Sequence, residues 1–253
     1  MATQAETHQA SQEAFASLVP RLVAQAWPLL VVTDLRGTLP GFVAAIQAIV
    51  RRFGAGSATA AVDYYRRERA ASGAPGRAQV HAAPVLNERV VESTVRSALS
   101  GLYGPISVET TASAQAQVSD AVTQLVLDQG RYTIIDAAQK DKAARGWARV
   151  TEPDACSFCL MLAIRAGAGF LYTSRQAGNF RAHDNCRCHV EPVFGPYEPP
   201  ARVRDAQALW GTATKGRSGA DARTAFRQAV EERPVTGKKR VKRPTPVPPG
   251  AGE

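Results

Sequence analysis

The sequence predicts an α+β protein with a mainly helical N-terminal region, a small cysteine-stapled α+β unit and a disordered basic tail. Apolar residues recur at helical spacing over most of the first 145 residues. All four cysteines lie between positions 156 and 188. From residue 195 onward, twelve Lys or Arg stand against six Asp or Glu, so most of the net charge of +9 is at this end. We therefore divide the chain into residues 1–145, 146–194 and 195–253.

Residues 10–145 are predicted to be helical. Between Pro40 and Gly54, apolar side chains repeat every three or four residues, at Phe42, Ile46, Ile49 and Val50. Further helices are predicted over 57–71, 86–102, 108–127 and 132–145. Gly104-Pro105 ends the helix over 86–102, and Gln129-Gly130 separates the last two.

The segment 146–194 changes in character. Residues 147–150 alternate like a short strand, and further strands are predicted over 170–172 and 186–194. Residues 159–165 can form one or two helical turns, which the segment Gly167-Ala168-Gly169 stops. This pattern predicts a small α+β unit that follows the helical region.

The last segment, 195–253, differs in composition from the rest of the chain. Helices are predicted over 201–210 and 221–232. Beyond them, the basic run 238–243 is followed by four prolines up to Pro249, and this composition cannot bury a core. We expect this end to be disordered, either as a solvated terminus or as a basic tail that contacts an acidic partner or DNA.

The N-terminus and the hydropathy predict no membrane segment and no signal peptide. The first thirteen residues are polar, and the most apolar stretch, 27–32, is far shorter than the roughly 20 residues needed to cross a bilayer. We therefore expect the chain to begin life in a reducing cytoplasm. In that compartment, closely spaced cysteines hold metal more often than they form structural disulfides.

The cysteines form two clusters with metal-ligand spacing. The first is Cys156-x-x-Cys159, and the second is His183-x-x-Cys186-x-Cys188. Two close pairs of soft ligands separated by a connecting segment are typical of a tetrahedral zinc site. In an extended segment Cys186 and Cys188 point to the same side, because side chains alternate. Cys156, Cys159 and Cys186 are thus predicted ligands, with Cys188 or His183 as the fourth.

Other interpretations of the cysteines are two disulfides, four buried free thiols or a redox Cys-x-x-Cys. A redox motif would leave the second cluster without a role. A catalytic zinc keeps an open position for water, whereas four thiolates and a histidine can close this site. We therefore predict a structural zinc, which can contribute on the order of 10 kcal/mol to folding so small a unit.

Residues 150–159 and 183–193 together resemble the signature of the phage Mu F-like family. These are the minor head, or head morphogenesis, proteins of tailed bacteriophages, and the variant here is most similar to those of actinobacteriophages. The resemblance implies a low-copy minor capsid protein that is associated with the portal and acts in virion assembly. Its implied partners are the portal, scaffold or major capsid protein, and its implied location is the phage head, after assembly in the host cytoplasm.

Members of this family in actinobacteriophages are often labelled capsid maturation proteases, which is the second functional hypothesis. The candidate catalytic groups are Ser157, Ser174, His81 and the pair His183-Asp184. The sequence contains neither a nucleophile elbow nor a His-Glu-x-x-His zinc motif. The four histidines leave few choices for a catalytic base, because two of them lie inside the metal cluster.

A zinc-containing DNA-binding protein is the third hypothesis. A zinc finger presents a basic helix beside its metal, whereas segment 160–182 carries only Arg165, Arg175 and Arg181 as charges. We expect the aromatic residues of this segment to pack beneath it rather than to stack on bases; these are Phe170, Tyr172 and Phe180.

Overall fold

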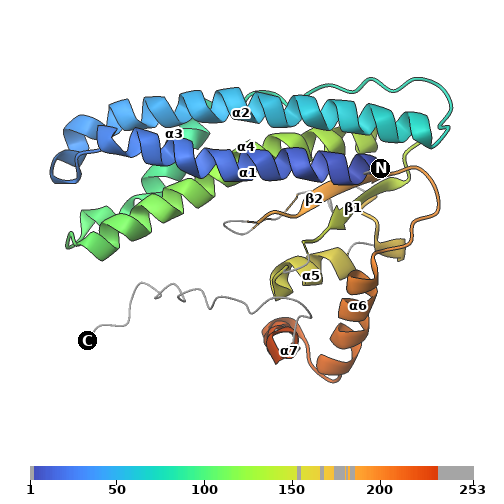
Figure 1. Ribbon diagram of the computed structural model, residues 1–253. Helices are drawn as coiled ribbons and strands as arrows, with labels where there is room; N and C mark the ends of the chain where they lie inside the picture. Colours follow the sequence, from blue (N-terminus) through green and yellow to red (C-terminus); the bar gives the residue numbers. More distant parts are fainter. Residues whose placement is uncertain are drawn as a thin grey trace.

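The computed structural model is mainly helical, with one two-stranded sheet, which confirms the predicted fold class. It describes residues 3–152, 155–165, 168–173, 180, 182 and 186–232. Long helices lie side by side in an elongated bundle, and the sheet and three shorter helices lie at one end of it (Figure 1). The tail predicted to be disordered, 233–253, lies outside the described residues.

The bundle consists of α1 (Gln4–Ala26), α2 (Leu35–Ala71), α3 (Glu88–Ala98) and α4 (Val108–Lys140), with short 3-10 turns at Trp27–Leu29, Val32–Asp34 and Ser100–Tyr103. Each helix begins where a polar side chain accepts a hydrogen bond from a free backbone N–H of the first turn. The capping residues are Thr3, Asp34, Asn87 and Ser107. The predicted helix over 86–102 corresponds to α3 and the 3-10 turn that follows it.

The two breaks predicted at glycines are wrong, because α2 and α4 each run through them without interruption. A Cβ at Gly54 would lie 2.9 Å from the Cγ of Gln129. A Cβ at Gly130 would lie 2.6 Å from the hydroxyl of Ser57. These glycines therefore allow α2 and α4 to approach closely, which outweighs the modest loss of helix propensity that glycine brings.

The sheet pairs β1 (Gly146–Val150) with β2 (His189–Val193) in antiparallel register, so that Gly146 faces Val193 and Val150 faces His189. Both correspond to predicted strands. The strand predicted over 170–172 is wrong, apart from one bridge between Trp147 and Tyr172. Residues 168–170 form a 3-10 turn, with φ of 74° at Gly169 and 63° at Phe170, and this left-handed backbone is incompatible with a strand.

Three shorter helices complete the fold: α5 (Ser157–Ile164), α6 (Ala201–Ala213) and α7 (Gly219–Glu232). They correspond closely to the helices predicted over 159–165, 201–210 and 221–232. The helices α6 and α7 are joined by the rings of Trp210 and Phe226, whose centroids are 5.0 Å apart. Figure 1 shows all three below the sheet.

Two clusters of buried side chains form the core. The first lies within the bundle and includes Val19, Phe42, Ile46, Val95, Val118 and Val122. The second joins α2 and α4 to the sheet and to α5–α7, and includes Tyr64, Tyr65, Ile134, Trp147, Cys159 and Phe226. The cysteines thus lie in a core that the helical region and the small α+β unit share.

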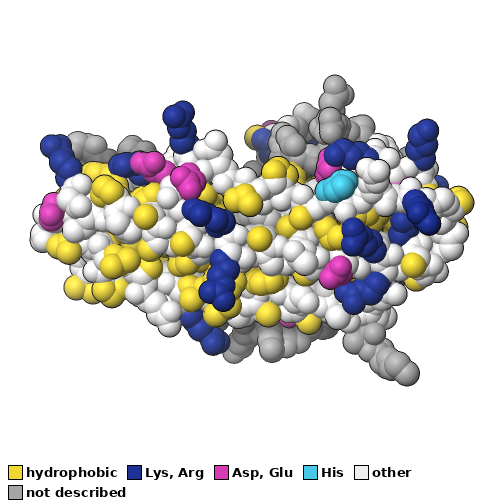
Figure 2. Space-filling view, turned by 90° about the horizontal axis from the view of Figure 1, so that it is seen from above, with side chains coloured by type: hydrophobic (Ala, Val, Ile, Leu, Met, Phe, Trp, Pro, Cys, Tyr) yellow, Lys and Arg dark blue, Asp and Glu magenta, His cyan; other side chains and the backbone are white. Residues whose placement is uncertain are grey.

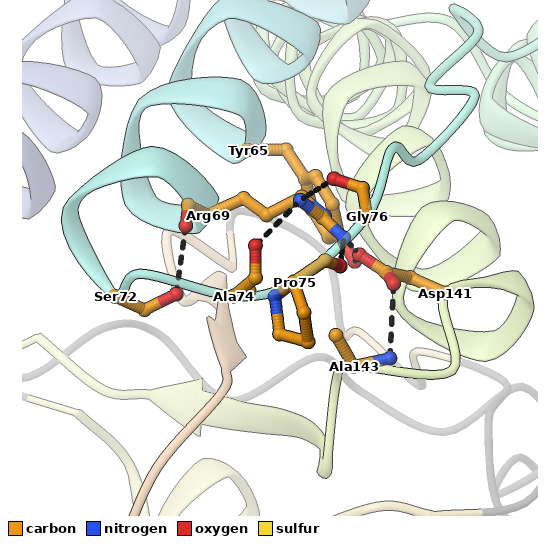
Figure 3. Close-up of polar contacts among 8 residues, drawn as sticks. All are labelled: Tyr65, Arg69, Ser72, Ala74, Pro75, Gly76, Asp141 and Ala143. Carbon is orange, nitrogen blue, oxygen red and sulfur yellow. Dashed lines mark hydrogen bonds and ion pairs between the residues drawn. The ribbon is translucent and has the colours of Figure 1, made fainter.

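A buried ion pair ties the C-terminal ends of α2 and α4 to the chain that follows each of them (Figure 3). Arg69 Nε donates to Asp141 Oδ2 at 2.8 Å, and Tyr65 donates to the same oxygen at 3.2 Å. The other guanidinium nitrogens of Arg69 donate to the carbonyl oxygens of Ala74, Pro75 and Gly76. Asp141 also accepts from the N–H of Ala143 at 3.0 Å, which directs the chain toward β1.

No single described helix is long and apolar enough to cross a membrane. Two consecutive helical segments are long and apolar enough only when they are counted together. These are Gln4–Leu29 and Val32–Ala71, which are bent by 63° relative to each other.

Candidate metal centre

Three cysteines converge on one point of the shared core. Cys159 lies on α5, whereas Cys186 and Cys188 lie just before β2. Their sulfur atoms all lie within 4.8 Å of one another, and each residue is only 2% exposed. Among the described residues, this trio is the group of side chains that could hold a metal ion.

The spacing of these sulfur atoms fits a tetrahedral thiolate site. Zinc–sulfur bonds of about 2.3 Å place neighbouring sulfur ligands about 3.8 Å apart in a tetrahedron. The Sγ atoms of Cys159 and Cys186 are 3.6 Å apart, and all four cysteines are free thiols. The arrangement therefore suits a metal and shows neither of the disulfides considered from the sequence.

The two remaining candidate ligands differ in what the structure shows. Cys156 is the N-cap residue of α5, one turn before Cys159, and is half-buried. Its sulfur is not part of the close trio, although it shares a hydrogen bond with Cys159. His183 lies outside the described residues. The choice of the fourth ligand therefore stays a prediction.

The thiols influence one another in the buried cluster. Hydrogen bonds with Cys156, Cys186 and Cys188 raise the pKa of Cys159. Hydrogen bonds from Cys159 and Cys188 lower the pKa of Cys186, and the positive charge of Arg131 lowers it further. These effects favour the negatively charged thiolate of Cys186, and the thiolate is the form of cysteine that binds metal.

Arg131 is a buried charged residue beside the cluster, and no sequence motif indicated it. It projects from α4, is 4% exposed and pairs with Asp128 at 2.8 Å. Burial raises the pKa of Asp128, and Arg131 acts in the opposite direction. Asp128 and Gln129 precede it in the sequence, so no local pattern marks Arg131 as a buried residue.

Aromatic rings enclose the centre on the side of β1. Trp147 stacks on Tyr172 with ring centroids 4.1 Å apart, and it also contacts Phe180, which is 3% exposed. The hydroxyl of Tyr172 donates to the carbonyl oxygen of Leu162 at 2.6 Å. Tyr172 and Phe180 therefore pack in the core as expected, which leaves them no role in stacking on bases.

The surface formed by α1 and α2 carries basic side chains together with acidic ones (Figure 2). Figure 2 views this face and shows acidic side chains interspersed among the basic ones. A nucleic-acid interface requires clustered positive charge. On the described part of this face, basic and acidic side chains are mixed (Figure 2).

The two candidate catalytic residues that the structure describes, Ser157 and His81, lie in different parts of the fold. Ser157 begins α5, and His81 is exposed in the connection between α2 and α3. Ser174, His183 and Asp184 lie outside the described residues. The described residues therefore give the protease hypothesis no assembled catalytic group.

A buried histidine of α1 lies close to the first residue of β2. The ring of His8 stacks on Tyr64 with centroids 4.4 Å apart, and it lies 6.5 Å from the ring of His189 on β2. Burial lowers the pKa of His8 to about 4, and the charge of Arg67 acts in the same direction. Burial also lowers the pKa of His189 to about 3, with contributions from His8 and Arg131.

We expect low pH to reduce the stability of the folded state, because His8 must then be protonated while it is buried. Because its folded-state pKa is below the unfolded value of 6.5, its contribution to stability is complete above pH 6.5 and is lost as pH falls toward 4. The loss is on the order of 3 kcal/mol. Denaturant unfolding of His8→Phe at pH 7 and pH 4.5 should show a smaller acid effect than wild type. The exposed control His81→Phe should keep the full effect, and equal acid effects in all three proteins would contradict this prediction.

A comparison with protein families identifies a match over most of the chain. The family model described as VG15 protein matches residues 1–213, which include the bundle, the cysteine cluster and α6. No curated protein and no solved structure matches the chain.

Proposed function

The chain belongs to the VG15 protein family, a phage-type family of viral gene products, and on that premise we propose that it is a minor head protein. It acts in head morphogenesis near the portal, as part of the virion. A structural zinc ion holds its small α+β unit against the helical bundle. The family assignment makes it a phage protein, and the cysteine pattern with its close sulfur trio supports the more specific role.

Zinc is the metal that suits this donor set. Cys159, Cys186 and Cys188 supply three thiolates, and Cys156 or His183 supplies the fourth ligand. Sulfur ligands select zinc over the hard cations, which prefer oxygen. Because the three sulfurs are nearly inaccessible to water, the ion would act as a cross-link rather than as a catalyst. The observation that carries this proposal is the convergence of these three thiols from two separate segments.

The far end of the bundle offers a surface for a partner. The α1–α2 turn and the beginning of α4 both lie at the end opposite the sheet (Figure 1). Exposed apolar side chains are found on the α1–α2 turn, in the connection that precedes α4 and at its first residue, namely Leu29, Val31, Tyr103, Ile106 and Val108. Val108 is 82% exposed, which is unusual for an apolar side chain unless a partner covers it. We propose the portal as that partner, with the scaffold and the major capsid protein as the other candidates.

Co-expression with the portal, scaffold and major capsid proteins of the same phage tests this function. We expect the tagged chain to copurify with the portal and to be present in purified heads. Ile106→Asp combined with Val108→Asp should abolish copurification, because a charge at the interface must be desolvated. Val85→Asp introduces a charge at another exposed valine and should have no effect.

Two outcomes would overturn the proposed function. One is a chain that copurifies with none of these proteins and is missing from heads. The other is specific cleavage of the capsid or scaffold protein that survives loss of the cysteines, which would favour the protease instead.

A further inference from the structure

Two arginine side chains lie buried against the cysteine cluster, although an arginine cannot ligate zinc. Arg131, on α4, is 4% exposed, and Arg149, on β1, is 3% exposed. Burial of a charged group is costly unless neighbouring groups compensate it. The groups that these two side chains contact therefore indicate what the positive charges do.

Arg131 bridges the backbone of the Cys186-x-Cys188 segment. Its Nε donates to the carbonyl oxygen of Cys188 at 3.0 Å, and its Nη2 donates to that of Cys186 at 2.5 Å. A planar guanidinium can make both bonds at once, which a lysine ammonium cannot reproduce. The contacts fix the segment that carries two of the three sulfur atoms.

Arg149 acts on a sulfur atom directly. Its Nη1 lies 4.0 Å from the Sγ of Cys186, within reach of an N–H···S hydrogen bond. Its guanidinium carbon lies 3.7 Å from the centroid of Phe180, and that of Arg131 lies 4.6 Å from the same ring. Phe180 thus holds both cations close to the cluster through cation–π contacts.

The charge of a metal–thiolate centre explains this arrangement. A divalent ion with four thiolates carries a net charge of −2, and with three thiolates and a neutral histidine it carries −1. In a buried site such a charge needs compensation. Arg131 already pairs with Asp128. Arg149 places a second positive charge beside the sulfurs, next to the sulfur of Cys186.

We infer that Arg131 and Arg149 are positioning residues of the metal centre: Arg131 orients the Cys186-x-Cys188 segment, and Arg149 compensates the charge of the thiolates. This inference rests on the proposed zinc site and adds the residues that set its affinity. Outer-shell partners of this kind contribute about 10- to 100-fold to metal affinity.

The test measures zinc affinity in the full-length chain by competition with a chromophoric chelator. Arg149→Met should bind zinc about 10- to 100-fold more weakly than wild type. Arg149→Lys, which keeps the charge, should recover part of the loss. Arg131→Met should also change the absorption spectrum of the cobalt-substituted protein, because the two cysteines that it orients can move.

The matched control is Arg187→Met. Arg187 lies between the same two cysteines in sequence but is exposed, so its loss should leave the affinity unchanged. Comparing Arg149→Met with Arg149→Lys separates a loss of charge from a loss of folding, because lysine retains the cation and most of the side-chain volume.

The inference is overturned if Arg149→Met and Arg131→Met bind zinc as tightly as Arg187→Met does. It is also overturned if Arg149→Lys is as weak as Arg149→Met, since charge would then not be the cause. A wild-type chain that binds no zinc would instead refute the zinc site of the proposed function, and the inference with it. Failure of the inference about the arginines and failure of the proposed zinc site therefore give different experimental results.

Discussion

Removal of the metal, by a chelator or by Cys159→Ser, is expected to cause the largest loss of stability in this chain. Cys159 joins α5 to the segment before β2, and its sulfur lies 3.6 Å from that of Cys186. A structural zinc contributes on the order of 10 kcal/mol to the folding of a small unit. Thermal unfolding with and without chelator, followed by tryptophan fluorescence, measures the effect, because Trp147 and Trp210 both pack with the cysteine-containing core.

The effect should be confined to one part of the molecule. The bundle has its own core, with fully buried residues such as Phe42, Ile46 and Val118. We therefore expect the helical circular dichroism of α1–α4 to persist after the fluorescence change. Ser157→Ala, on the same helix as Cys159, is the matched control and should unfold like wild type. A chelator that leaves the unfolding of wild type unchanged would contradict the prediction.

Arg69→Met is expected to have the second largest effect. The side chains of Arg69 and Asp141 are 12% and 5% exposed, and the substitution leaves the carboxylate buried without its cation (Figure 3). Breaking a buried pair in this way costs about 3–5 kcal/mol. It also removes the donors to the carbonyl oxygens of Ala74, Pro75 and Gly76. Denaturant unfolding at pH 7 measures the loss.

An exposed ion pair between α2 and α3 provides the control. Arg51 and Glu88 also form a short contact, but their side chains are 60% and 67% exposed. Arg51→Met should cost no more than about 1 kcal/mol. Adding Asp141→Leu to Arg69→Met should restore part of the stability, because no charge is then left buried. Equal effects of Arg69→Met and Arg51→Met would refute the role of the buried pair.

Much of this fold follows from local patterns in the sequence. The helical periodicity predicted that residues 10–145 are helical, although it divided α2 and α4 at Gly54 and Gly130. The sequence pattern also predicted strands that correspond to β1 and β2. The cysteine spacing predicted Cys156, Cys159 and Cys186 as ligands, with Cys188 or His183 as the fourth, and the structure brings Cys159, Cys186 and Cys188 together. The helices and strands depend on patterns among residues that are close in sequence. The cysteine cluster could be predicted because few types of side chain bind zinc.

The features that the sequence did not reveal depend on contacts between distant segments. Gly54 and Gly130 have the local signature of a break, and only the crossing of α2 and α4 explains why the helices continue. Arg131 and Arg149 reach the cysteine segment across separations of 55 and 37 residues. No local pattern distinguishes these two arginines from the many solvated ones.

The most direct test of a metal-held core is native mass spectrometry of the purified full-length chain, combined with elemental analysis. We predict one zinc ion per chain, lost together with the native fold of the α5–β2 region when Cys159 is replaced by serine. A correctly folded chain whose mass corresponds to the polypeptide alone would contradict this account.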